Sequence, residues 1–284
     1  MVRILVDSGA DYEQEELRRL GLECLPITIR FGEETFLDGV ELSKEAFYER
    51  LETQFPATSQ PTPLDFAEHF RSAREAGDEL VAILLSSSLS GTYQGACLAR
   101  EDVGGDGIYL IDSKSATIGI QVLVDYAVKL RDRGCSGQEI AEALRELQPR
   151  VKVFASMDTL EYLYKGGRLS RASAAIGTLS RLKPVIHLDE SGAVAVVSKC
   201  LGMKRSIDAL VAKVESYRLD PAFPIYPIYS RDISHLKTMV GRLRDKGFAV
   251  DEAEGRNLGP TIGAHIGPGC CGVAFVAAEE TGVC

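Results

Sequence analysis

The sequence predicts an α/β protein with a parallel sheet in its N-terminal half and a mixed sheet in its C-terminal half. Apolar runs of strand length alternate with helical patterns up to about residue 150, which is typical of parallel strands joined by helices. Farther along, Asp189-Glu190-Ser191-Gly192 lies between two apolar runs and predicts a hairpin. Pro149 marks the change between these two patterns. We therefore expect two domains, residues 1–150 and 151–284.

The first elements bring two polar segments to the ends of strands. We expect strands at residues 4–6, 24–31 and 34–37, and helices at residues 13–20, 43–51 and 64–70. The first strand ends at Asp7-Ser8, where side-chain oxygens are concentrated. Thr58-Ser59-Gln60-Pro61 precedes the third helix, and its proline stiffens a loop that leaves Thr58 and Ser59 exposed.

The central strand is the apolar run at residues 79–85, which shows no polar alternation and is expected to be covered on both faces. It stops in the hydroxyl-rich residues 86–92, and a helix is expected over residues 94–101. Turns of this kind lie at the carboxyl ends of strands, where open α/β sheets bind ligands, and a helix start offers free N–H groups to an anion. Residues 86–92 therefore predict a site for a small anionic group.

The remaining elements follow the same patterns. A strand at residues 108–111 and helices at residues 120–130 and 134–147 complete the first domain. In the second domain we expect strands at residues 151–155, 185–188, 193–197, 225–229, 250–254 and 272–277, and helices at residues 160–163, 172–182 and 204–217. Arg168 lies in a basic glycine turn, and residues 259–269 predict a glycine-rich loop that carries His265.

Composition excludes several classes of function. The net charge of -9 and a pI near 5.1 argue against nucleic acid as a partner, because such binding needs a basic face. The first residues enter a strand pattern directly, and no later stretch reaches about 18 apolar residues, so we expect a cytoplasmic protein without stable membrane insertion. Seven irregularly spaced cysteines indicate reduced thiols, and Cys270-Cys271 is expected to be buried rather than to bind metal.

Six motifs in order resemble those of the DegV family of bacterial fatty-acid-binding proteins, and the resemblance covers nearly the whole chain. These motifs are Asp7-Ser8, Thr58-Ser59-Gln60-Pro61, residues 87–94, Asp112-Ser113, residues 166–170 and residues 263–269. The resemblance implies a two-domain fold with a long-chain fatty acid between the domains and no cofactor. It also implies a carrier role without catalysis, in which a separate ATP-using fatty acid kinase converts the presented acid to its acyl phosphate.

The resemblance also implies roles for particular residues. It places the ligand carboxylate against Thr58 and Ser90, with His265 in the same hydrogen-bonded cluster and backbone N–H groups near Gly91 and Thr92 contributing. Arg205 and Arg168 are candidates for contact with the head group or with the kinase. The sequence departs from the common family pattern at Ile266, where threonine is expected, and at Cys270-Cys271, where a small and an apolar residue are usual.

A fatty acid needs an apolar tunnel, because burial of each methylene contributes about 0.8 kcal/mol and the tail therefore dominates affinity. The small-residue helix expected at residues 172–182 is our candidate wall, with Ala174, Ala175, Ile176 and Leu179 as its tunnel residues. Ordinary helix packing is the alternative for each of them. For Arg168 and Arg205, the alternative to a contact with the head group or the kinase is a salt bridge at the surface or between the domains.

Two enzyme classes compete with the carrier interpretation. An acyl ester or thioester hydrolase would use Ser90 as nucleophile and His265 as base, although Ser88 and Thr92 occupy the glycine positions of the usual Gly-x-Ser-x-Gly turn and no orienting acid is identifiable. A kinase would need a phosphate-binding loop of the form Gly-x-x-x-x-Gly-Lys-Ser/Thr, which the sequence lacks. We therefore predict a lipid carrier.

Overall fold

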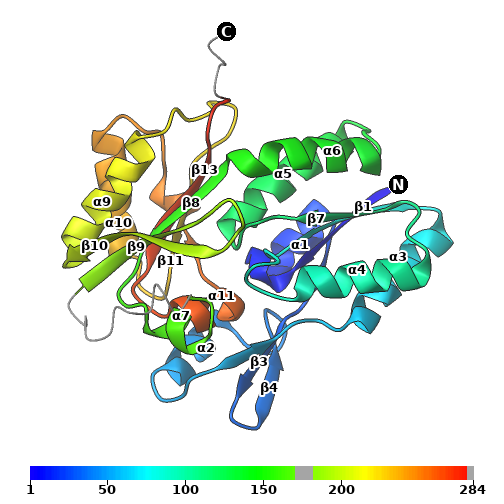
Figure 1. Cartoon of the computed structure of the whole chain (residues 1–284), viewed down its shortest axis with the longest axis horizontal. Helices are drawn as coiled ribbons and strands as arrows, with labels where there is room; N and C mark the ends of the chain where they lie inside the picture. The colour runs from blue at the N-terminus through cyan, green and yellow to red at the C-terminus, as the bar shows by residue number, and fades with distance from the viewer. Residues whose placement is uncertain (170–181, 280–284) are drawn as a thin grey trace.

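The computed structural model describes residues 1–169 and 182–279, and its N-terminal half is built on a four-stranded parallel sheet. Figure 1 shows this sheet with helices on both of its faces. The strand order is β2 (Leu22–Leu25), β1 (Val2–Asp7), β6 (Glu79–Leu84), β7 (Ile108–Asp112). The helices are α1 (Gln14–Leu20), α3 (Pro63–Ala76), α4 (Thr92–Val103), α5 (Ile118–Asp132) and α6 (Gly137–Leu147).

Burial of both faces explains why these strands carry apolar runs without polar alternation. In β1, Ile4 and Val6 belong to the core on the side of α5 and α6, whereas Leu5 belongs to the core under α3 and α4. All three side chains are fully buried. Each strand therefore contributes to two cores, and the hydroxyl-rich segments lie in the loops that leave the sheet.

The C-terminal half contains a six-stranded mixed sheet, as predicted. The strand order is β10 (Val194–Leu201), β9 (Leu182–Leu188), β8 (Val151–Ser156), β13 (Cys271–Val276), β11 (Tyr226–Tyr229), β12 (Arg256–Asn257). Only the β11–β12 pair is parallel. Helices α9 (Met203–Glu215) and α10 (Ser234–Asp245) pack on its outer face, where Phe154 and Phe275 stack at a centroid distance of 6.2 Å.

A third, smaller unit lies below these two sheets in Figure 1. Its three-stranded antiparallel sheet has the order β4 (Glu34–Leu37), β3 (Thr28–Phe31), β5 (Ala57–Ser59). Helix α2 (Lys44–Leu51) and helix α11 (Pro260–Ile266) pack on it and share a core that includes Ile29, Phe47 and Ala264. Helix α7 (Glu161–Lys165) lies next to α11. Residues far apart in the sequence thus form one compact unit.

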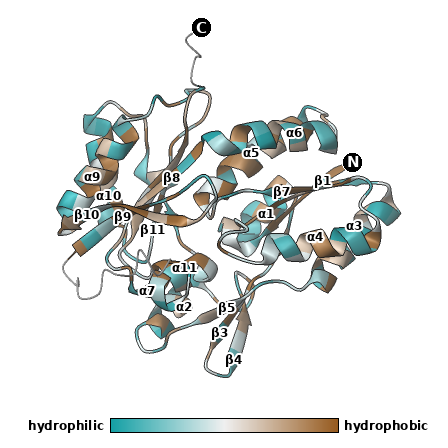
Figure 2. Ribbon diagram, viewed as in Figure 1, coloured by the Kyte–Doolittle hydropathy of each residue, from teal (hydrophilic) through white to brown (hydrophobic). Residues whose placement is uncertain are grey.

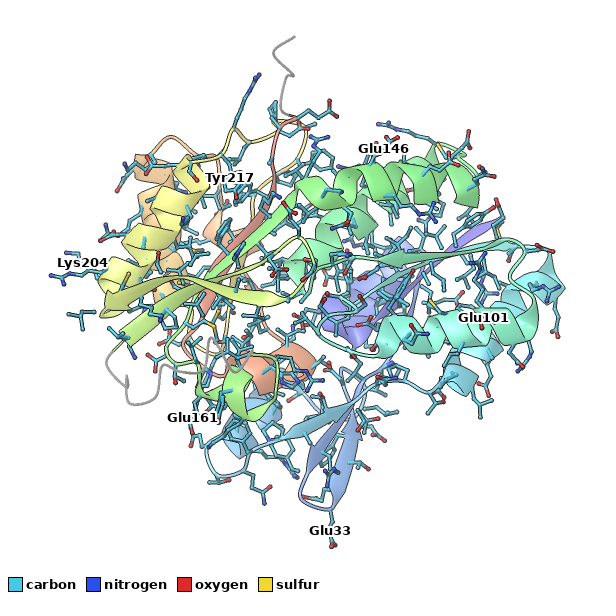
Figure 3. All side chains as sticks on the ribbon, in the orientation of Figure 1. Glu33, Glu101, Glu146, Glu161, Lys204 and Tyr217 are labelled. Carbon is cyan, nitrogen blue, oxygen red and sulfur yellow. The ribbon has the colours of Figure 1, made fainter. Side chains whose placement is uncertain are left out.

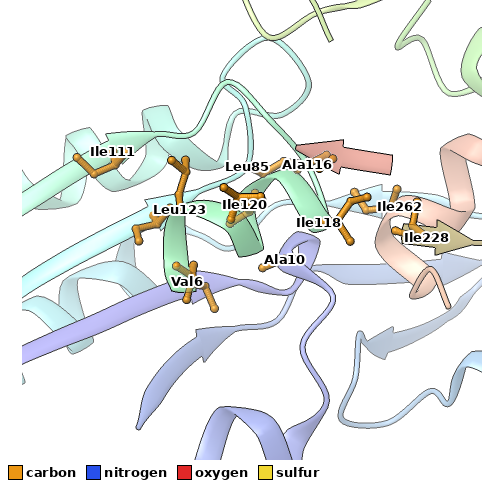
Figure 4. Close-up of a cluster of buried hydrophobic side chains, with 14 of the residues drawn as sticks. Val6, Ala10, Leu85, Ile111, Ala116, Ile118, Ile120, Leu123, Ile228 and Ile262 are labelled. Atoms are coloured by element: carbon orange, nitrogen blue, oxygen red, sulfur yellow. The ribbon is translucent and has the colours of Figure 1, made fainter. Parts of the chain in front are cut away.

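Helix α5 is packed against both large sheets. Its residues 118–124 are buried without interruption, and one core cluster joins them to β1 and β6 on one side and to Ile228 and Ala274 of the mixed sheet on the other. Figure 4 shows Ile118, Ile120 and Leu123 of this helix within that cluster. Hydropathy follows the same plan in Figure 2, where both large sheets are mostly brown and the outer helix faces are teal. The expected boundary at residue 150 precedes β8, and the division into two domains remains a prediction.

Three local expectations were wrong. The strand expected at residues 250–254 is mostly the 3-10 helix Glu252–Glu254, and the neighbouring strand β12 has only two residues. The loop expected at residues 259–269 contains α11, because its glycines allow close packing that overrides their low helix propensity. Thr58 lies in strand β5 rather than in an exposed loop. Helix α10 was not predicted.

The described part of the chain shows neither a membrane-spanning helix nor a metal-binding cluster. None of its helices combines the length and apolarity needed to cross a bilayer. Within the same residues, no three His, Cys, Asp or Glu side chains are grouped so that they could hold a metal ion. Cys270 and Cys271 are both buried, and burial raises the pKa of Cys270 to about 12. Their expected role as buried small residues fits these surroundings.

Candidate functional site

A cavity of about 350 Å³ lies between the inner face of the mixed sheet and the loops that follow β6 and β7. Figure 4 shows Leu85, Ala116, Ile228 and Ile262, four of its wall residues, which come from four separate segments. Its apolar lining includes Ile27, Leu85, Ala116, Val153, Ala155, Ile186, Leu188, Val194, Ile228, Leu258, Ile262 and Ile266. A cavity of this size and polarity fits an elongated apolar ligand.

Four of the polar side chains that line this cavity are called the polar cluster below: Thr58, Ser90, Arg168 and His265. Thr58 comes from β5, His265 from the last turn of α11, and the two are joined by a 3.0 Å hydrogen bond between Thr58 Oγ1 and His265 Nε2. Ser90 precedes α4 and comes from the parallel sheet. The structure therefore brings together strand β5, the loop of residues 86–91, called the serine loop below, and the last turn of α11.

Ser90 is held in place by its own loop. Its Oγ lies 2.8 Å from Oγ1 of the buried Thr92, and its backbone N–H donates to Ser86 O at 3.1 Å. Gly91 is the N-cap of α4. The side chain of Gln60 packs against it, and a Cβ at this position would lie only 2.1 Å from Gln60 Oε1. Gly91 and Thr92 are not part of the cavity wall, and a contribution of their backbone N–H groups to carboxylate binding remains a prediction.

The imidazole of His265 is neutral over the physiological range. Burial lowers its pKa to about 4, and the nearby charge of Arg168 acts in the same direction. The ring edge that carries Nδ1 lies against Gly166, where a Cβ would approach to 2.2 Å. Nδ1 has no hydrogen-bond partner among the described residues. His265 is therefore a hydrogen-bonding group here rather than a cation.

Arg168 is half-buried, and burial lowers its pKa from the ordinary arginine value, but an arginine keeps its charge in proteins. Its Nε donates to Leu89 O at 2.9 Å and its Nη1 to Gly166 O at 2.6 Å. In residues 1–169 and 182–279, no carboxylate forms an ion pair with it. A partly desolvated cation beside two hydroxyl groups favours an anion supplied from outside the protein.

The other predicted residues are distributed differently. Arg205 is exposed in the first turn of α9 and does not line the cavity, and Figure 3 shows the neighbouring Lys204 pointing away from the molecule. A docking role for Arg205 remains a prediction. The four tunnel candidates, Ala174, Ala175, Ile176 and Leu179, lie outside the described residues. Among the described residues, strands β8, β9 and β11 and helix α11 contribute to the apolar wall.

Sequence reasoning missed three residues that contribute to this site. Gln60 lines the cavity beside Thr58 and stood in the same motif, so its neighbourhood was a usable signal. Two buried carboxylates, Asp11 and Asp38, contact the N-terminal end of α11 and had no comparable signal, because acidic residues are usually solvated.

The tip of the β9–β10 hairpin closes one side of the cavity wall against the serine loop. Ser86 Oγ donates to Gly192 O at 2.9 Å, and Ser88 Oγ donates to Ser191 O at 2.6 Å. Gly192 has a φ of +80°, and a Cβ there would lie 2.2 Å from Ser86 Oγ. Leu188 and Val194, on either side of this turn, line the cavity.

The geometry does not favour the hydrolase alternative. Ser90 Oγ is bonded to Thr92, and the nearest hydroxyl partner of His265 is Thr58. A general base that activates serine needs a second group that orients its other ring nitrogen, and Nδ1 of His265 has none among the described residues. Its pKa of about 4 also makes it a weak base.

Comparison with known proteins gives consistent matches over the full length. A family model described as "Uncharacterised protein, DegV family" matches residues 1–278. A DegV domain-containing protein from Caldanaerobacter subterraneus subsp. tengcongensis is 33% identical over 276 residues, which cover 96% of this chain and 98% of that protein.

Solved structures agree with these matches. A fatty-acid-binding DegV family protein from Thermus thermophilus is 29% identical, with a TM-score of 0.87 over 98% of this chain and 99% of that one. A stearic-acid-binding protein from Eubacterium ventriosum is 26% identical, with a TM-score of 0.85 over 98% of both chains. The α/β architecture with one parallel and one mixed sheet is thus a DegV-like fold. With a family model spanning residues 1–278 and a relative at 33% identity, the chain belongs to the DegV family.

Proposed function

We propose that this protein binds a long-chain fatty acid, with the acyl chain in the apolar cavity and the carboxylate at the polar cluster. The observation that carries the proposal is an apolar cavity whose polar side holds two hydroxyl groups and a half-buried arginine without a carboxylate partner among the described residues. The similar proteins from Thermus thermophilus and Eubacterium ventriosum, which bind fatty acids, support the same ligand class.

The tail supplies most of the affinity in this proposal. A chain of roughly 14 to 16 methylenes contributes on the order of 12 kcal/mol when it leaves water, before the costs of association are subtracted. Carboxylate contacts then fix the direction of the ligand. Arg168 compensates the ligand charge, and the N-terminal end of α4 beside Ser90 adds a positive dipole end.

His265 orients the Thr58 hydroxyl toward the ligand. A buried N–H without an acceptor is rarer and more costly than a buried lone pair without a donor. The ring proton therefore belongs on Nε2, which donates to Thr58 Oγ1, and the unpartnered Nδ1 faces Gly166. Thr58 then accepts from His265 and keeps its own proton for the ligand carboxylate.

Presentation to a separate ATP-dependent fatty acid kinase completes the proposal. Ser59 and Gln60 line the cavity and are exposed, so the carboxylate lies near the surface, with one oxygen available for phosphoryl transfer by the partner. The chain acts as a carrier and needs no cofactor. Arg205 on α9 is a candidate contact for the kinase.

The test is native mass spectrometry, followed by extraction, on protein purified from bacteria without added lipid. We expect a stoichiometric fatty acid in the wild type and its loss in Thr58→Ala plus Ser90→Ala. Ser136→Ala, which removes the N-cap of α6 far from the cavity wall, should retain the ligand. An empty wild type that also fails to take up added fatty acids would contradict the proposal, and labelling of Ser90 by a fluorophosphonate would then favour the hydrolase.

A further inference from the structure

Helix α11 carries His265, and two buried carboxylates hold its N-terminal end. Gly259 N donates to Asp11 Oδ1 at 2.8 Å. Thr261 donates to Asp38 Oδ2 twice, from its backbone N at 3.2 Å and from its Oγ1 at 2.5 Å. Asp11 and Asp38 are each only 4% exposed. These contacts satisfy N–H groups that a helix start leaves free, because the carboxyl oxygens accept their hydrogen bonds.

The three-stranded sheet β4-β3-β5 holds α11 at a second point, the hydrogen bond between Thr58 and His265. Asp38 follows β4 and donates its N–H to Ile27 O at 3.0 Å, whereas Thr58 in β5 pairs with Ile29 of β3. Thr261 and His265 are four residues apart on α11, about 6 Å along its axis. The helix therefore bridges the sheet from Asp38 to Thr58, and the Asp38 contact determines where His265 meets Thr58.

Sideways movement of α11 is already blocked by its neighbours. A Cβ at Gly263 would lie 2.7 Å from the ring of Phe47 in α2, and a Cβ at Gly267 would lie 2.3 Å from the ring of Tyr162 in α7. Displacement along the helix axis is opposed by the two carboxylates. Thr261 and Ile262 also line the cavity, so an axial shift would move cavity wall and His265 together.

Burial of a carboxylate at a helix end costs free energy, because the charged form loses its hydration. Burial raises the pKa of Asp38 above its usual range, and Lys44 opposes this effect while Asp7 and Asp11 lie nearby as further acids. Such groups rarely add net stability, and their best-attested contribution is a defined geometry. A role in positioning accounts for this arrangement better than a role in stability.

We propose that Asp38, supported by Asp11, is a positioning residue for carboxylate recognition: through Thr261 it sets the place of α11 and hence the hydrogen bond from His265 to Thr58. This inference rests on the proposed fatty acid ligand. Asp38 lies outside the cavity wall, yet its loss should weaken binding of the carboxylate head group and leave binding of the acyl tail unchanged.

The test compares two ligands with the same tail and different heads. Dissociation constants for palmitic acid and hexadecanol are measured by displacement of a fluorescent fatty acid from the full chain, and their ratio reports head-group recognition. In Asp38→Ala we expect the preference for the acid to fall about tenfold, equivalent to one charge-assisted hydrogen bond. Asp38→Asn, which keeps one acceptor and the side-chain volume, should give an intermediate loss.

The outcomes distinguish a positioning role of Asp38 from a purely structural one. Ser136→Ala serves as the control, because it removes the α6 N-cap hydrogen bond and should leave the ratio unchanged. Equal weakening of both ligands in the two Asp38 variants, or no change in either, would show that Asp38 has only a structural role and would overturn the inference. A wild type that binds both ligands without preferring the acid would refute carboxylate recognition itself, and a wild type that binds neither would refute the proposed function.

Discussion

Gly166 lies directly beneath the ring of His265, at a position where only hydrogen fits. Its φ of -74° is ordinary, so alanine there is excluded by contact and not by backbone strain. Gly91 stands in the same relation to Gln60, because a Cβ at Gly91 would lie 2.1 Å from Gln60 Oε1. Two glycines that the sequence shows only as turn signals thus leave room for His265 of the polar cluster and for the neighbouring Gln60.

Gly166→Ala should displace His265 and break its hydrogen bond to Thr58. Overpacking of this kind costs about 1–3 kcal/mol of unfolding free energy, and fatty acid affinity should fall with it. Gly241→Ala is the control: it lies inside α10 with nothing within 4 Å of the added Cβ and should raise stability by about 0.5–1 kcal/mol. Denaturant unfolding and ligand titration measure both effects. Unchanged affinity in Gly166→Ala would contradict the role given to His265.

Asp11 should make stability depend on pH. Burial raises its pKa from 3.8 to about 7, so the folded protein holds a proton that the unfolded chain releases. This contribution is fully present below the unfolded pKa and is lost as the pH rises from about 4 to 7. Asp11→Asn keeps an acceptor for Gly259 N–H and has no proton to lose. Its stability relative to wild type should therefore increase by up to a few kcal/mol across this window, as urea unfolding at several pH values would measure. A difference independent of pH would contradict the raised pKa.

Sequence reasoning identified the residues that lie in local motifs and missed those defined by distant contacts. Thr58 and Ser90 belong to polar segments next to strands, and such segments are visible in the sequence alone. Asp38 looks like an ordinary loop acid until Thr261, more than two hundred residues away, is packed against it. Its burial is a property of the assembled fold, which local patterns do not encode.

At the scale of elements, the β9–β10 hairpin links the mixed sheet to the serine loop through its tip. Gly192→Ala should force the tip away from Ser86, because the added Cβ would overlap its hydroxyl at a residue with positive φ. We expect a stability loss about 1–3 kcal/mol beyond the cost of positive φ, together with faster release of a fluorescent fatty acid. Gly247→Ala separates the two effects, since Gly247 has a φ of +85° and an open environment. Equal release rates in both variants would show that the hairpin tip does not retain the ligand.

Elements with a clear apolar period were predicted well, and elements set by packing were not. The strands around β6 and the hairpin follow from runs of apolar residues and from turn chemistry. Helix α11 was taken for a loop because Gly259, Gly263 and Gly267 are poor helix formers. In the structure two of them allow contacts with Phe47 and Tyr162 that a larger residue would prevent. Tertiary packing therefore stabilises a helix in this segment despite the low helix propensity of its glycines.

At the scale of the whole molecule, the polar cluster is assembled from three units. The parallel sheet supplies Ser90, the small sheet with α11 supplies Thr58 and His265, and the segment after α7 supplies Arg168. Tyr226 of β11 and Tyr12 further connect the halves through Asp125 of α5, at 2.9 and 3.2 Å. Glu101, Glu146 and Glu161 lie at the outside of the molecule in Figure 3, whereas Arg168 brings a positive charge to the cavity of a protein of net charge -9.

The burial of residues 118–124 of α5 between the two large sheets has a consequence for how the chain melts. A helix packed on one domain alone can stay folded when the other domain unfolds. Helix α5 is packed on both large sheets, so separation from either sheet would expose its apolar surface to water. We therefore expect a single calorimetric transition, with the measured enthalpy equal to the van't Hoff enthalpy, and similar hydrogen-exchange protection in β6 and β13. Two separate transitions would show that each half keeps its own core. If melting is concerted, the two predicted domains are one cooperative unit, and a ligand that holds either half should protect both.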